Sequence, residues 1–71
     1  MSEARAQALN HFYNYLKFGG DNFHSLLFRL IQKADQANFA RLQEGFPQEC
    51  YVYLDWFNCE SEQEFWKREG L

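Results

Sequence analysis

The chain has 71 residues, of which 46% are hydrophobic and 20% aromatic, and its formal net charge at pH 7 is −3. This length provides for one hydrophobic core, so we expect a single helical domain over residues 1–71 and exclude a multidomain enzyme. The acidic balance argues against nucleic-acid binding, because nucleic-acid-binding proteins usually carry a basic patch that contacts phosphates.

The amino-terminal part of the chain predicts two helices. Ser2 can cap the first helix, and Gly19-Gly20 ends it because glycine readily adopts the left-handed conformation at a helix C-terminus. The apolar residues of this helix recur at helical spacing and are Leu9, Phe12, Tyr13 and Leu16. Asp21 or Asn22 then caps a second helix, which we expect to supply much of the core. Its broad apolar stripe consists of Phe23, Leu26, Leu27, Leu30, Ile31 and Ala34.

Asp35 leaves one alternative open in the middle of the chain. If it acts as an N-cap, a third helix runs to Gly45; if it is simply an exposed side chain, the segment Phe23–Glu44 is one long helix. Gly45-Phe46-Pro47 is a firm boundary in either case, since glycine ends helices and proline suits their first turn.

The carboxyl-terminal part predicts two more helices. In the first, four apolar residues follow the helical period and are expected to face the core: Cys50, Tyr53, Leu54 and Phe57. The segment 50–54 also has good β propensity, but the polar neighbours and the upstream proline favour a helix. Ser61 and Glu64 form a capping-box pattern that opens a last short helix with Phe65 and Trp66. The sequence therefore predicts an all-α fold, a compact bundle of four or five short helices.

The histidines and cysteines predict neither a metal site nor a catalytic centre. His11, His24, Cys50 and Cys59 form none of the closely spaced pairs that chelate metals. We expect both cysteines to be free thiols that fill core positions in a reducing cytoplasm. A glycine-rich phosphate loop is also lacking in the sequence. We therefore expect no catalytic, cofactor-binding or metal-binding residues and no enzymatic activity.

An acidic, aromatic-rich segment over residues 42–66 is the candidate functional feature. It contains six carboxylates, seven aromatic residues and no lysine or arginine. Such a surface can dock into a basic groove, because rings supply contact area and carboxylates supply steering and register. The alternative is that the rings face inward, the carboxylates face water and the segment binds nothing.

Helical geometry indicates which side chains of this segment would meet a partner. Trp56 and Trp66 are expected to be exposed anchors, followed by Tyr51, because they lie away from the stripe that contains Cys50. The candidate partner-binding residues are Tyr51, Asp55, Trp56, Glu60, Glu62 and Trp66.

The middle of the chain resembles small reading frames of bacterial phages and mobile elements. The resemblance rests on an Asp-x-x-Asn helix, an Arg-Leu pair and a Gly-Phe-Pro turn followed by Gln-Glu and an aliphatic position. In this chain the motif residues are Asp35, Asn38, Arg41, Leu42, Gly45, Phe46 and Pro47, with Cys50 standing where valine would be expected. The resemblance implies no specific activity. It does imply a class of proteins that often bind host proteins, among them anti-CRISPR and other anti-defence inhibitors.

These observations favour a non-enzymatic protein-binding module in the cytoplasm of a bacterial host cell, without a signal peptide or membrane segment. The leading hypothesis is a phage-encoded inhibitor of a host defence nucleoprotein that acts through the acidic, aromatic surface. One alternative is a self-associating structural or accessory homodimer. A weaker one is a small DNA- or RNA-binding module that uses Arg29, Lys33 and Arg41.

Overall fold

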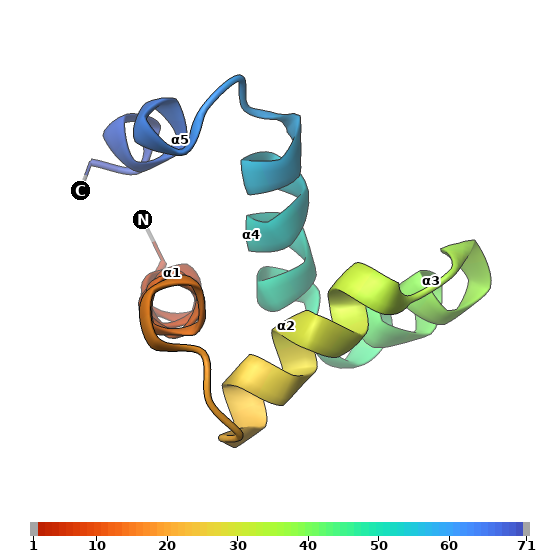
Figure 1. The fold of residues 1–71 in the computed structure, drawn as a ribbon. Coiled ribbons are helices and arrows are strands. Elements are labelled where there is room, and N and C mark those ends of the chain that lie inside the picture. Colours follow the sequence, from red (N-terminus) through yellow and green to blue (C-terminus); the bar gives the residue numbers. More distant parts are fainter. Residues whose placement is uncertain (1, 71) are drawn as a thin grey trace.

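The computed structural model describes residues 2–70, and every regular element in this part of the chain is a helix (Figure 1). In chain order the helices are α1 (Glu3–Phe18), α2 (Phe23–Lys33), α3 (Gln36–Gly45), α4 (Pro47–Asn58) and α5 (Glu62–Arg68). The Cα radius of gyration is 11.6 Å, close to the ~11 Å expected of a compact chain of this length. The predicted all-α fold, a small bundle of short helices, is confirmed.

Short polar side chains fix where four of the helices begin. In each case a side-chain oxygen accepts a hydrogen bond from the backbone N–H three residues further on. These capping residues are Ser2, Asn22, Asp35 and Ser61.

Asp35 decides the question that the sequence left open. Its backbone is extended, with φ −71° and ψ 176°, and its carboxylate accepts from the N–H of Asn38 at 2.8 Å. The chain therefore leaves α2 and starts α3 within two residues, so the segment from Phe23 to Glu44 is two helices. The next helix, α4, starts at Pro47 without a side-chain cap, because proline has no N–H that needs a partner in the first turn.

Helix α4 occupies the centre of the bundle and packs against each of the other four helices (Figure 1). Cys50 and Val52 are both fully buried, although residues two apart on a helix point about 200° away from each other. A helix that is covered on several sides has no single apolar stripe. This is why the expected core face of α4 is wrong in part: Val52 is buried, whereas Phe57 is 65% exposed.

The core is built around the ring of Phe12 on α1, which is completely buried. Its centroid lies 4.8 Å from that of Phe28 on α2, 5.4 Å from that of Trp56 on α4 and 6.3 Å from that of Phe65 on α5. One aromatic side chain thus contacts rings from three other helices. The nine buried apolar residues are Ala8, Leu9, Phe12, Leu27, Phe28, Ile31, Cys50, Val52 and Phe65.

Only part of the broad stripe on α2 enters this core. Leu27, Phe28 and Ile31 are buried, but Phe23, Leu26 and Leu30 are 62%, 47% and 54% exposed. On α1, Tyr13 is likewise exposed although it follows the helical period. No helix within residues 2–70 is long and apolar enough to span a membrane.

Candidate functional site

The two tryptophans of the acidic segment are not the exposed anchors that the sequence predicted. Both are half-buried and pack against the core. The Trp66 ring lies 4.8 Å from that of Phe65 and 5.6 Å from that of Tyr13, and its indole N–H donates to Glu62 at 3.4 Å. Trp56 is held against Phe12. The physical reason is that both rings pack against aromatic side chains of α1, which buries a large apolar surface.

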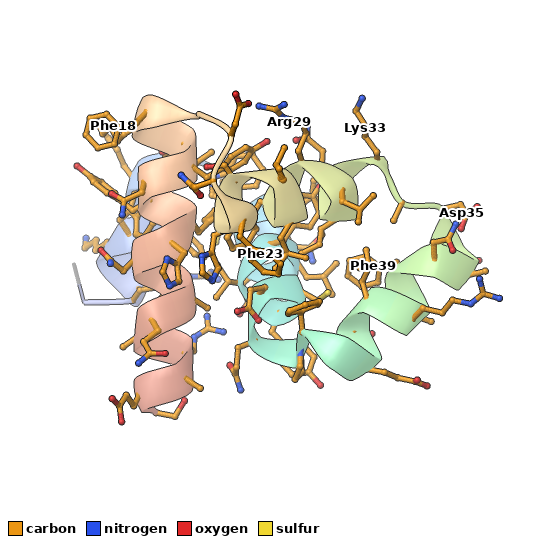
Figure 2. The ribbon with its side chains drawn as sticks, turned by 90° about the horizontal axis from the view of Figure 1, so that it is seen from below. Phe18, Phe23, Arg29, Lys33, Asp35 and Phe39 are labelled. Carbon is orange, nitrogen blue, oxygen red and sulfur yellow. The ribbon has the colours of Figure 1, made fainter. Side chains whose placement is uncertain are left out.

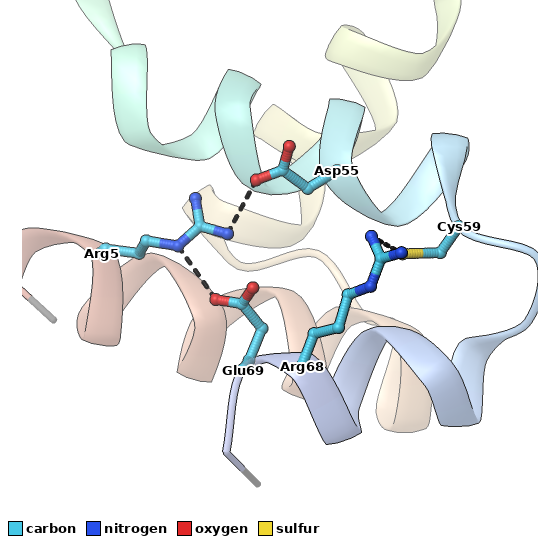
Figure 3. Close-up of polar contacts among 5 residues, drawn as sticks. All are labelled: Arg5, Asp55, Cys59, Arg68 and Glu69. Carbon is cyan, nitrogen blue, oxygen red and sulfur yellow. Dashed lines mark hydrogen bonds and ion pairs between the residues drawn. The ribbon is translucent and has the colours of Figure 1, made fainter.

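Asp55 on α4 belongs to a cluster of charged side chains that also includes Arg5 on α1 and Glu69 at the end of α5 (Figure 3). The guanidinium of Arg5 on α1 donates through Nη2 to Asp55 at 2.8 Å and through Nε to Glu69 at 3.0 Å. The hydrogen bond that Arg5 donates to Glu69 is the main cause that raises the pKa of Arg5, while desolvation opposes it. Arg5 thus offsets the charge of Asp55, so this carboxylate is less available to a partner than the sequence suggested.

The six predicted residues do not form one continuous surface. Trp56, Glu60 and Glu62 line a shallow depression of about 250 Å³ at the junction of α4 and α5, together with the exposed Phe57. Tyr51 is exposed on another side of α4, about 140° around the helix from Trp56. The structure therefore brings three of the six side chains together and adds Trp66 through its hydrogen bond to Glu62.

A different surface, which we call the α2 face, presents three large apolar side chains to solvent. It consists of Phe23, Leu26 and Leu30, which lie on one side of α2 because they are spaced by three and four residues. Figure 2 shows Phe23 on one edge of α2, while Arg29 and Lys33 extend from the opposite edge. The Phe23 ring also lies 5.9 Å from that of Phe46, at the end of α3.

Sequence reasoning missed the α2 face as a site, although the signal was present. Six of the eleven residues of α2 are large and apolar, and on a helical wheel they cover an arc of about 200°. An amphipathic surface helix needs an arc of little more than 100° to cover a core. The excess breadth of the stripe was the sign that part of it would remain uncovered.

A groove of about 490 Å³ continues the α2 face between α2 and α3. Its apolar lining comes from Leu30, Ala34 and Leu42, and its cationic lining comes from Lys33 and Arg41. Asp35 and Asn38 complete the lining. The groove lining therefore combines three apolar residues with two cations and one carboxylate.

The histidines and cysteines of the chain are His11, His24, Cys50 and Cys59. His11 and His24 stack with their ring centroids 3.5 Å apart and an interplanar angle of 2°. Burial, and next the neighbouring His11, lower the pKa of His24. Burial raises the pKa of the Cys50 thiol, with Glu49 adding to it, which keeps the thiol protonated. Both cysteines are free, and within residues 2–70 no three His, Cys, Asp or Glu side chains gather closely enough to hold a metal ion.

Comparison with protein-family models, curated proteins and solved structures gives no match. The resemblance to phage and mobile-element reading frames therefore remains a prediction from the motif alone.

Proposed function

We propose that this chain is a non-enzymatic protein-binding module that docks its partner on the α2 face. The observation that carries the proposal is the exposure of Phe23, Leu26 and Leu30, each about half or more accessible to solvent, on one side of a single helix. The largest exposed apolar patch of a small domain is often an interaction site.

The energetics support this use of the face. Fully burying a leucine or phenylalanine stabilises by about 1.5–3 kcal/mol, so covering three half-exposed side chains is worth roughly 3 kcal/mol. Lys33 lies three residues from Leu30 on α2 and lines the adjoining groove, so it can add orientation and on-rate to that apolar contribution.

The test compares capture of proteins from a nuclease-treated bacterial lysate by the tagged wild type and by matched variants. The variant Leu26→Ser/Leu30→Ser removes the α2 face. Phe18→Ser is the control, because Phe18 is even more exposed, at 80%, but extends from the end of α1 away from Phe23 (Figure 2). Captured proteins are identified by mass spectrometry, and their binding is then measured with both components purified.

A partner that binds the wild type and Phe18→Ser but not the folded double variant supports the proposal. Equal binding by all three proteins refutes it. Capture of a second copy of the chain alone favours the homodimer, and salt-sensitive binding to random duplex DNA favours a nucleic-acid-binding module.

The depression between α4 and α5 supports a second candidate function, that of a phage-encoded inhibitor of a host defence nucleoprotein. The exposed Phe57 and the carboxylates of Glu60 and Glu62 line this depression. An aromatic ring beside two carboxylates suits docking into the basic nucleic-acid-binding groove of a host protein. The variant Glu60→Lys/Glu62→Lys tests this candidate in the same assay. Loss of the partner in this variant, with binding retained by Leu26→Ser/Leu30→Ser, assigns the docking face to α4–α5.

A further inference from the structure

The groove between α2 and α3 combines apolar and cationic side chains in a way that the α2 face alone does not show. Leu30 and Leu42 approach it from the two helices, and Lys33 and Arg41 line it from the same two helices. Phe23 and Leu26 extend its apolar lining toward the start of α2. From Phe23 to Leu30 this lining runs for about 10 Å, which is two turns of a helix.

The cations of this region have no carboxylate partner within the described part of the chain. The ion pairs among residues 2–70 involve Arg5 and Arg68, not Arg29, Lys33 or Arg41. Helix α2 itself contains no acidic residue. Asp35, the carboxylate in the groove, already accepts the hydrogen bond that caps α3.

We propose that this groove binds an acidic amphipathic helix of a partner protein, an inference that rests on the proposed function and names its partner class. A helix with apolar residues at i, i+3 or i+4 and i+7 presents about the same 10 Å of apolar side chains as the lining from Phe23 to Leu30. Carboxylates on the flanks of that helix complement Lys33 and Arg41, which line the groove.

Two other occupants fit these observations less well. A second copy of the chain would set one α2 against another, and each carries two cations and no carboxylate, so like charges would face each other. A nucleic acid offers phosphates to the cations but no apolar surface for Leu26 and Leu30, and the net charge of −3 repels it at long range.

The experiment selects a displayed library of random peptides of about 16 residues, roughly four helical turns, on the immobilised wild-type chain. Peptides that bind the variant Leu30→Ser are removed from the library beforehand, so that peptides bound elsewhere on the chain are discarded. We expect the enriched peptides to be acidic and to carry apolar residues at helical spacing. Fluorescence anisotropy with synthetic versions then measures their affinity for purified variants.

We expect Leu30→Ser and Lys33→Glu/Arg41→Glu each to weaken binding by about tenfold or more. Lys17→Glu is the matched control, because it reverses an exposed charge on α1 and should leave affinity unchanged. Circular dichroism and urea unfolding confirm that each variant is folded.

Three results would overturn the inference. The first is no enrichment over the depleted library, and the second is enrichment of neutral or basic peptides. The third is stronger binding to vesicles rich in anionic lipid than to any enriched peptide, which would make the groove a membrane contact. If lysate capture still depends on Leu26 and Leu30 while the library fails, the proposed function stands and only the acidic-helix partner is refuted.

Discussion

The α2 face and the acidic surface of α4–α5 differ in how their aromatic and apolar side chains are used. On α4–α5, the large rings of Trp56 and Trp66 turn inward and close the core around Phe12. On α2, Phe23, Leu26 and Leu30 remain at the surface although they belong to the most apolar stripe of the chain. Chemical type alone therefore does not tell a core residue from a contact residue. The number of helices that cover each side of a helix decides it.

The sharpest test of this difference lies within α2, between two neighbouring leucines. Leu27 is 6% exposed, so Leu27→Ala should lower the free energy of unfolding by about 3 kcal/mol. Leu26→Ala should cost less than about 1 kcal/mol, because much of that side chain is already in water. Urea denaturation followed by circular dichroism measures both. Equal losses would mean that α2 is covered on both sides.

The next test concerns two neighbouring aromatic residues on α4. Trp56→Ala should cost roughly 2 kcal/mol of unfolding free energy, since the ring packs edge-on against Phe12. Phe57→Ala should cost about 0.5 kcal/mol or less because that side chain is mostly exposed. Thermal unfolding of the two variants shows the order. A less stable Phe57 variant would restore the core face that the sequence predicted.

A smaller effect is expected from the two carboxylates that bind Arg5. The Glu69 side chain is 14% exposed and that of Asp55 is 55% exposed. Glu69→Gln should therefore destabilise by about 1 kcal/mol, and Asp55→Asn by a few tenths because solvent screens its ion pair. Urea titrations at low and high salt measure this difference. If Asp55→Asn proves the more damaging, Asp55 contributes chiefly to the fold and not to a partner-binding surface.

The smallest expected effect is a pH dependence that arises beside the α2 face. In the folded chain the pKa of His24 is lowered by burial and by the stacked His11, while Glu49 opposes the shift. The unfolded chain therefore binds this proton at a higher pH, near 6.5, than the folded chain does. The contribution of neutral His24 to stability is therefore fully present above about pH 6.5 and is lost as the pH falls through the pKa of His24 in the folded chain.

We expect the urea midpoint of the wild type to fall more between about pH 7.5 and about pH 5 than that of His24→Gln. If the urea midpoints of the two proteins fall by the same amount, the acid sensitivity arises from carboxylates and not from His24.

The features that depend on local chemistry could be predicted from the sequence. Ser2 and Ser61 cap their helices, and Pro47 begins one, because capping requires only residues a few positions apart. Whether the chain breaks at Asp35 could not be decided, since an aspartate on a helix surface and one at an N-cap look alike in sequence.

The candidate site was harder to predict because it depends on which helices meet. Cys50 and Val52 point in nearly opposite directions, and both are buried because α4 is central. A single-stripe reading of α4 placed Phe57 inside and Trp56 outside, and both assignments are wrong. Glu60 and Glu62 are exposed, as expected of charged side chains near the start of a short helix, and their role in partner binding stays a prediction.

The contact between Arg5 and Glu69 has a consequence for the order of assembly during synthesis. It joins positions 64 residues apart, so it cannot form until α5 has been made. Until then the ring of Phe12, which α5 covers with Phe65 and Trp66, remains partly open to water and to chaperones. Helices α2 and α3, in contrast, can dock on α4 without α5. The groove between α2 and α3 therefore does not depend on the contact that closes the core beneath α5.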